Sequence, residues 1–169
     1  MEILTACYSS PIGLIELTAS DKGLATLYFI EEKTHKEDPA DPFLKIALQQ
    51  LDEYFNSGRK IFDVPLHPSG TPFQLKVWNE LLDIPFGKTI SYLSLAKRVG
   101  DKNSTRAVGS ANGKNPISLI IPCHRVIGHD GKLTGYGGGL WRKEWLLKHE
   151  GVIRPSGQVS IFTGSELNS

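Results

Sequence analysis

The sequence predicts an α+β protein, in which a small antiparallel sheet with one helix precedes a mainly helical part. Three short β-type segments lie within the first 30 residues, and most later apolar patterns have helical spacing. The charge also changes: residues 1–70 hold six Lys and Arg against eleven Asp and Glu, whereas residues 71–150 hold twelve against six. These counts favour two modules, the second suited to a polyanion, although chance clustering on solvated faces explains them equally well.

The first module is expected to be an antiparallel meander followed by one helix. Turn residues at 9–13 and 20–22 separate its strands. Apolar spacing over residues 43–55 predicts the helix. The strands are expected at residues 2–8, 14–19 and 23–30, with a short one at 62–66. Residues 67–72 contain Pro and Gly and indicate a linker, so the first domain is expected to span residues 1–70.

The second module, residues 71–151, is expected to be a helix-turn-helix domain. Its helices are expected at residues 73–82, 92–99, 104–112 and 140–149. Thr71 and Ser91 are expected to cap the first two, and Gly100 to end the second. A glycine-containing turn between short helices is the helix-turn-helix signature, which plain helical domains share. The remaining segments are expected as a buried strand at 117–121, a glycine-rich loop at 128–139 and a loosely held or disordered tail at 152–169.

The third helix of this module has unusually small side chains. Arg106 is its one large polar residue, and Ala107, Ser110 and Ala111 have the spacing of a shared face. Gly109 inside the helix costs about 1 kcal/mol relative to alanine. Small side chains let a helix approach a partner closely. The partner is either another helix in the core or a nucleic acid groove, and a narrow minor groove needs small residues most.

Several classes of protein are not expected from the sequence. No apolar run approaches the ~18–20 residues of a membrane span, and the N-terminus lacks a signal-peptide pattern, so we expect a cytoplasmic protein. Cys7 and Cys123 are the two cysteines, and a disulfide between them is not expected in the cytoplasm. The cysteines and histidines lack zinc-ligand spacing, so we expect no metal site.

Cys123 lies in a context that favours a nucleophile. A lone cysteine is usually a small buried hydrophobe, which is our interpretation of Cys7. Cys123 instead follows an apolar segment and Pro122, and precedes His124 and Arg125. Neighbouring positive charge lowers a thiol pKa, and an oriented histidine can act as its base. We therefore expect these two neighbours to activate the thiol.

The motif Pro-Cys-His-Arg-Val at residues 122–126 resembles that of the O6-alkylguanine-DNA alkyltransferases, also called methylated-DNA–protein-cysteine methyltransferases. The resemblance covers residues 72–151 closely and the N-terminal part loosely. It implies a ribonuclease-H-like domain at 1–70, followed by a winged-helix-like helix-turn-helix domain at 71–151 that carries the active site. Further motifs follow in the family's order at residues 85–87, 91–92, 106–109, 115–116, 136–140, 143–147 and 149–151.

The resemblance implies four catalytic residues. Cys123 would accept the alkyl group, and His124 would take the thiol proton through a water. Glu150 would hold the imidazole, completing a chain from cysteine to glutamate. Asn115 would be the hinge that ties the recognition helix to the active-site loop.

It also implies a set of DNA-contacting residues. Arg106 would enter the base stack and fill the space left by an extruded nucleotide, while Ala107 and Ser110 would lie against the minor groove. Tyr92 would donate to the extruded purine, and the carbonyls of Cys123 and Val126 would accept from its exocyclic amine. The pocket wall would be formed by Tyr136 and Gly137, with Lys143 supporting it.

The implied activity is direct reversal of DNA damage. A monomer without a cofactor would bind double-stranded DNA, extrude O6-alkylguanine and transfer the alkyl group irreversibly to its own Cys123. Whether O4-alkylthymine is also a substrate stays open. Two other functions are considered: a damage sensor that binds alkylguanine without transfer, which the presence of Cys123 opposes, and a cysteine hydrolase or redox protein, which would leave Arg106 and the basic second part unexplained.

Overall fold

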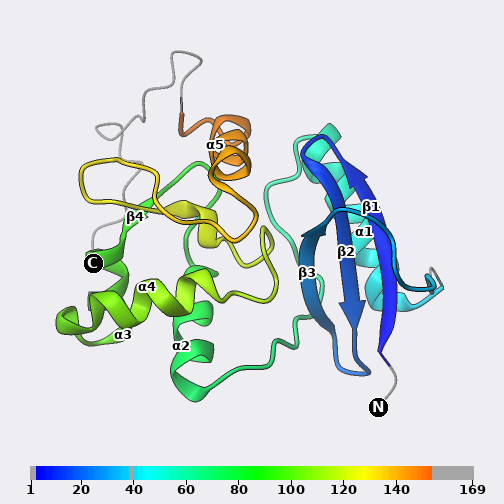
Figure 1. The fold of residues 1–169 in the computed structure, drawn as a ribbon, viewed down its shortest axis with the longest axis horizontal. Coiled ribbons are helices and arrows are strands. Elements are labelled where there is room, and N and C mark those ends of the chain that lie inside the picture. The colour runs from blue at the N-terminus through cyan, green and yellow to red at the C-terminus, as the bar shows by residue number, and fades with distance from the viewer. Residues whose placement is uncertain (1–2, 39, 154–169) are drawn as a thin grey trace. The chain divides into compact units, whose positions relative to one another are not determined.

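The computed structural model describes residues 3–38 and 40–153, which form two compact units. One unit contains the chain up to Ser69 together with Pro116–Ile120, and the other contains Gly70–Asn115 and the chain from Ile121 onward. Figure 1 shows a small sheet with its helix in the first unit and a group of helices in the second. The fold is α+β, as the sequence predicts. No helix of the described residues is long and apolar enough to cross a membrane.

The first unit is built on a three-stranded antiparallel sheet. Its strands are β1 (Leu4–Ser10), β2 (Gly13–Ala19) and β3 (Leu24–Ile30), in the order β1-β2-β3. Helix α1 (Pro42–Asn56) covers one face of this sheet (Figure 1). Its start is fixed by Asp41, whose side chain accepts a hydrogen bond from the Leu44 N–H at 3.0 Å. The core between sheet and helix buries apolar side chains from both, among them Ile15, Leu17, Leu44, Leu51 and Tyr54.

The strand expected at residues 62–66 is reduced to one bridge between Leu66 and Leu24. The Leu24 N–H donates to the Pro65 carbonyl at 2.8 Å, and the His67 N–H donates back to the Leu24 carbonyl at 2.8 Å. Pro65 has no N–H of its own, so the ladder stops there. A Cβ on Gly23 would lie 2.7 Å from the Pro65 oxygen, which explains the glycine at this close approach.

The prediction of a strand at residues 117–121 is wrong, although the segment is buried as predicted. One bridge, between Ile117 and Leu27, joins it to β3. The chain then turns sharply, because Leu119 has a φ of 73° and the Ile120 N–H donates to the Ser118 carbonyl at 2.8 Å. A hydrogen bond across a single residue with positive φ defines a strained γ-turn. The segment leading to Cys123 is therefore bent and not extended.

The second unit contains four α-helices in its described residues: α2 (Pro72–Leu81), α3 (Tyr92–Val99), α4 (Thr105–Gly113) and α5 (Leu140–His149). A two-residue parallel pair, β4 (Ile90–Ser91) with β5 (Val126–Ile127), and the 3-10 turns η1 (Lys102–Ser104) and η2 (Cys123–Arg125) complete it. Thr71 forms a capping box with Gln74, Ser91 caps α3, and Gly100 ends α3 with a φ of 112°. These local signals explain why the predicted helices agree to within a residue or two.

Helices α3 and α4 form the predicted helix-turn-helix pair, and α2 packs against both. The buried Trp78 indole on α2 donates to the Ala111 carbonyl on α4 at 2.8 Å, which fixes these two helices together. The start of α4 lacks a side-chain cap. Ser104 occupies the N-cap position but makes no side-chain cap bond, and Asp101 instead accepts from the Asn103 N–H at 2.8 Å in the preceding turn η1.

The expectation of a loosely held tail from residue 152 is wrong for its first two residues. Val152 and Ile153 are buried in a cluster with Ile127 and Leu147. Their N–H groups both donate to the Leu147 carbonyl, at 2.9 and 3.3 Å. These contacts fix the chain just beyond α5. The rest of the expected tail, residues 154–169, lies outside the described residues.

Candidate active site around Cys123

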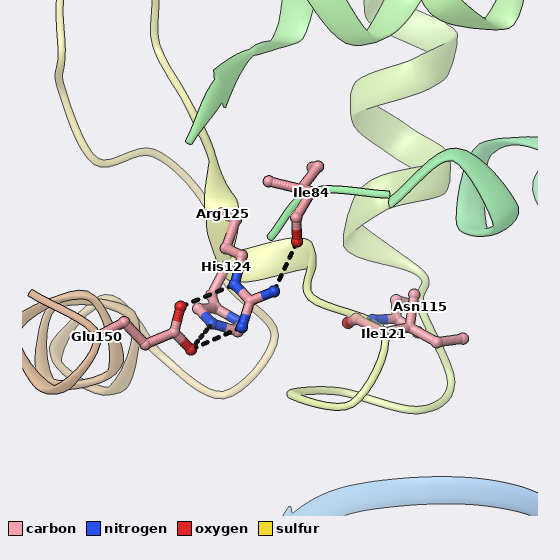
Figure 2. A network of polar contacts seen from close by, with 6 residues as sticks. All are labelled: Ile84, Asn115, Ile121, His124, Arg125 and Glu150. Carbon is pink, nitrogen blue, oxygen red and sulfur yellow. Dashed lines mark hydrogen bonds and ion pairs between the residues drawn. The ribbon is translucent and has the colours of Figure 1, made fainter. Parts of the chain in front are cut away.

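Cys123 is held in place by the end of α4. The thiol residue is buried at the start of η2, and its N–H donates to the Ile121 carbonyl at 2.8 Å. The Asn115 carboxamide donates to the same Ile121 carbonyl at 2.7 Å (Figure 2). The Asn112 carboxamide donates to the Cys123 carbonyl at 3.4 Å. Both backbone neighbours of Pro122 are therefore anchored by side chains that lie in the last turn of α4 or two residues beyond its end.

His124 and Glu150 form a fully buried pair. Nε2 of His124 lies 2.8 Å from Oε2 of Glu150, as Figure 2 shows. Burial lowers the pKa of His124, and the charge and hydrogen bond of Glu150 only partly offset this, so the imidazole is neutral at pH 7. Burial also opposes ionisation of Glu150, but His124 and Arg125 outweigh it and hold the pKa of that carboxyl well below its usual range.

This pairing fixes which nitrogen of His124 can act as a base. An ionised carboxylate can only accept, so the neutral imidazole carries its proton on Nε2 and donates it to Glu150. The lone pair is then on Nδ1. That atom is buried and has no hydrogen-bond partner among residues 3–38 and 40–153. The site thus contains a buried, unoccupied proton acceptor on the residue next to the thiol.

Arg125 does not have the role expected from its position in the sequence. Its Nε donates to Glu150 Oε1 at 2.7 Å, and one terminal nitrogen donates to Oε2 at 3.1 Å. The other terminal nitrogen donates to the Ile84 carbonyl at 2.7 Å, at the loop after α2 (Figure 2). All three contacts are buried, so the guanidinium is committed to Glu150 and the backbone.

The expected lowering of the thiol pKa by His124 and Arg125 is therefore wrong. Burial raises the pKa of Cys123, and the hydrogen bond from Asn115 and the charge of Lys143 offset this only in part. His124 contributes no charge because it is neutral, and the charge of Arg125 is matched by Glu150. Cys123 consequently rests as a thiol, and a base must remove its proton during reaction.

The residues predicted to contact DNA from α4 lie on its outer face. Arg106, Ala107 and Ser110 are exposed, whereas Val108, Ala111 and Asn112 are buried. The predicted small face is thus divided, because Ala111 packs inward beside Trp78. The exposed part still presents two small side chains beside one arginine.

Lys143 on α5 binds three backbone carbonyls beside the site. Its fully buried ammonium donates to the carbonyls of Val126 at 2.7 Å, Thr134 at 2.8 Å and Gly135 at 3.3 Å. Burial lowers the pKa of this lysine to about 8, and only the thiolate form of Cys123 would act against this. The Val126 carbonyl expected to receive a substrate amine therefore already accepts from Lys143.

The predicted pocket residues lie beside the same loop. The Tyr92 hydroxyl donates to the Thr134 carbonyl at 3.2 Å, so it is tied to residues 128–139. The Tyr136 ring lies edge-on to the His124 ring, with centroids 6.5 Å apart. A Cβ on Gly137 would lie 3.9 Å from the Gly113 oxygen, which places this glycine beside the end of α4. The structure thus brings α3, α4, α5 and the glycine-rich loop together around Cys123.

Asn112 is a site residue that was not predicted, and Arg125 binds Glu150 instead of acting on the thiol as expected. One signal for Asn112 was available: it lies four positions after Val108, on the buried face of α4, where a polar side chain needs a reason. No group of three or more His, Cys, Asp and Glu residues that could hold a metal ion occurs within residues 3–38 and 40–153.

Comparison with known proteins identifies the family. Residues 3–68 match the family model of the 6-O-methylguanine DNA methyltransferase ribonuclease-like domain, and residues 72–152 match that of its DNA-binding domain. The methylated-DNA–protein-cysteine methyltransferase of Methanosarcina acetivorans is 48% identical over 151 residues, covering 86% of this chain and 97% of that protein. The protein of the same name from Mycobacterium tuberculosis (strain H37Rv) is 47% identical over 158 residues, 90% of this chain and 94% of that one.

Solved structures agree with this. The crystal structure of Mycobacterium tuberculosis O6-methylguanine methyltransferase matches with a TM-score of 0.80 at 41% identity, covering 94% of this chain and 96% of that chain. A second structure, of Mycobacterium tuberculosis OGT in complex with DNA, matches with a TM-score of 0.79 at 44% identity, covering 89% of this chain and 92% of that chain. The chain belongs to the methylated-DNA–protein-cysteine methyltransferase family.

Proposed function

We propose that this protein repairs alkylated DNA by direct reversal, moving an alkyl group from O6 of guanine to Cys123. The observation that carries the proposal is the buried thiol beside His124, whose Nδ1 is an unoccupied acceptor because Nε2 is bonded to Glu150. A thiol with an oriented base is the arrangement that nucleophilic catalysis requires. Membership of the family supports the same reaction.

DNA recognition is assigned to the outer face of α4. Ala107 and Ser110 are small enough for close contact with the minor groove of duplex DNA, and Arg106 beside them can enter the base stack. Extruding a nucleotide costs a few kcal/mol, and a side chain in the vacated space offsets part of that. The net charge of +6 in residues 71–150 favours the polyanion. Tyr92, Tyr136 and Gly137 would surround the extruded base.

The chemical step is a displacement at the alkyl carbon. His124 Nδ1 takes the thiol proton through a water, and Glu150 stabilises the imidazolium that forms. The sulfur forms a bond to the alkyl carbon as the bond from that carbon to O6 breaks. The guanine leaves as an anion and takes up one proton, so the thiol proton is balanced overall. Asn115 holds the turn before Cys123 at Ile121 throughout.

The product is an S-alkyl cysteine. A thioether resists hydrolysis, so each molecule acts once and consumption of the protein is stoichiometric. We further propose that the protein acts as a monomer in the cytoplasm, on chromosomal DNA. The charge and proton transfers above involve residues of this chain alone.

Intact mass measures this function directly. The protein is mixed with a duplex that carries one O6-methylguanine, weighed, and digested to locate the modification. One added methyl on the Cys123 peptide, complete at one equivalent, is the expected result. The Cys123→Ser variant should gain no mass, whereas Cys7→Ser should react like the parent. Tight binding with unchanged mass would indicate a damage sensor. The absence of both binding and a mass change would overturn the assignment to alkylated DNA.

A further inference from the structure

Asn112 is a buried polar residue with half of its side chain unsatisfied. Its NH2 group donates to the Cys123 carbonyl at 3.4 Å, which fixes the orientation of the amide because only the nitrogen end can donate there. Its Oδ1 is buried and has no hydrogen-bond partner within the described residues. A buried acceptor without a donor costs stability, so such a group in a folded protein needs an explanation.

The position of Asn112 points to the pocket for the extruded base. On one side its carboxamide touches the residue that carries the nucleophile. On the other side the carbonyl of the next residue, Gly113, lies 3.9 Å from where a Cβ of Gly137 would be, and Gly137 belongs to the proposed pocket wall. Asn112 therefore contacts the Cys123 residue and directly precedes the residue that faces that wall.

The unsatisfied atom is an acceptor, so its partner must be a donor. O6-alkylguanine keeps one N–H donor group on its pairing edge, the exocyclic amine, because alkylation of O6 leaves N1 without hydrogen. Of the two carbonyls expected to receive this amine, that of Val126 already accepts from Lys143 at 2.7 Å. The carbonyl of Cys123 already accepts from the Val126 N–H, and it receives a long bond from Asn112 itself. Asn112 Oδ1 is the acceptor in this group that lacks a donor.

We propose that Asn112 accepts a hydrogen bond from the exocyclic amine of the extruded base and thereby selects O6-alkylguanine over O4-alkylthymine. The terminal torsion of an asparagine side chain is broad, and the 3.4 Å bond is weak, so the carboxamide can turn its oxygen toward the amine without a shift of α4. O4-alkylthymine has no N–H donor on its pairing edge. A site that hydrogen-bonds a donor rejects an analogue lacking it, because its acceptor stays unpaired. This inference rests on the proposed function.

The test combines a protein change with deletion of the amine from the base. Single-turnover transfer rates are measured with duplexes carrying O6-methylguanine, O6-methylhypoxanthine, which lacks only the amine, and O4-methylthymine. The variants are Asn112→Leu, an apolar side chain of similar size, and Asn112→Ala. Asn79→Ala on the exposed side of α2 is the matched control. Because each variant is compared with itself on two bases, a loss of folded protein cancels in the ratio.

The preference of the parent for O6-methylguanine over O6-methylhypoxanthine should fall about tenfold in both Asn112 variants, the size expected for one neutral hydrogen bond. The preference over O4-methylthymine should fall by a similar factor, and Asn79→Ala should change neither ratio. Equal slowing on guanine and hypoxanthine would overturn the inference and assign Asn112 to positioning of Cys123. If the parent itself transfers from none of the three, the proposed function fails first, which is a distinguishable result.

Discussion

His124 and Glu150 lie 26 positions apart in the sequence, and their side chains meet at 2.8 Å in the fully buried centre of the second unit. The carboxylate serves two partners at once, because Arg125 binds both of its oxygens. The charges of Arg125 and Glu150 are thus removed from water together. Such a pair is stable only while both members are present, because either one alone would be an uncompensated buried charge.

Glu150→Gln should therefore damage both stability and reaction. It leaves Arg125 buried without its counter-charge, and we expect a loss of about 3–5 kcal/mol in the free energy of unfolding. It also removes the negative charge that stabilises the imidazolium formed at His124, so transfer should slow more than the folded fraction accounts for. Chemical denaturation and single-turnover rates under folding conditions measure the two effects separately.

Glu144→Gln is the matched control for that variant. Glu144 lies on α5, the helix that ends just before Glu150, in an exposed i,i+4 pair with Lys148 at 3.5 Å. Exposed pairs of this kind contribute little, so its unfolding free energy should stay within ~0.5 kcal/mol of the parent. A loss of similar size in both variants would show that the buried network has no special importance.

Much of the fold could be predicted because its signals are local. Capping residues, glycines and apolar spacing placed α2, α3 and α5 to within a residue or two, and turn residues separated the three strands. The segment at residues 117–121 is different. Its apolar residues correctly indicated burial, but the positive φ of Leu119 has no local signature, since a leucine rarely adopts it. That turn depends on tertiary contacts with β3 and not on the segment itself.

The chemistry of the site could be predicted only in part, for a similar reason. A sequence shows that Arg125 is next to Cys123 along the chain, but not that its guanidinium reaches Glu150, 25 positions later. The sign of the effect on the thiol pKa depends on that pairing and on burial, which is why the expectation of an activated thiolate was wrong. Likewise, Val152 and Ile153 look like part of a polar tail, although they complete an apolar cluster that begins at Ile127.

The pH dependence of transfer should follow the base and not the thiol. Burial lowers the pKa of His124 below its usual 6.5, so the neutral form prevails at and above pH 7. We expect single-turnover rates that are flat between pH 7 and 8 and that fall with acid below pH 6.5, where the imidazole becomes protonated. A rate that rises about tenfold for each pH unit between 7 and 8 would instead indicate attack by a preformed thiolate.

Lys143 should leave a signature in stability at alkaline pH. Its pKa in the folded protein is about 8, below the ~10.4 of an unfolded chain. Between these values the unfolded state binds one more proton, so the free energy of unfolding rises with pH. Relative to Lys143→Met, the parent should gain about 2 kcal/mol from pH 7.5 to pH 10. Denaturation of both proteins at pH 7.5, 9 and 10 measures this difference.

Lys148→Met removes an exposed lysine from the same helix and is the control for that comparison. Its difference from the parent should stay constant over the same pH range. A constant difference for Lys143→Met as well would contradict the buried charge, and would mean that the ammonium reaches water in solution.

Arg106 should matter for extruding the base and not for the chemistry. Its side chain is exposed on α4, so Arg106→Ala should leave the unfolding free energy within ~0.5 kcal/mol of the parent. Transfer from duplex O6-methylguanine should slow about 10- to 100-fold, because the cost of extrusion is no longer offset. Transfer from the free base O6-benzylguanine needs no extrusion and should be unchanged. Arg106→Lys keeps the charge but lacks a planar group that can stack, so it should resemble the alanine variant in rate while retaining more of the salt-dependent affinity. Equal slowing on the free base would place Arg106 in the pocket instead of the base stack.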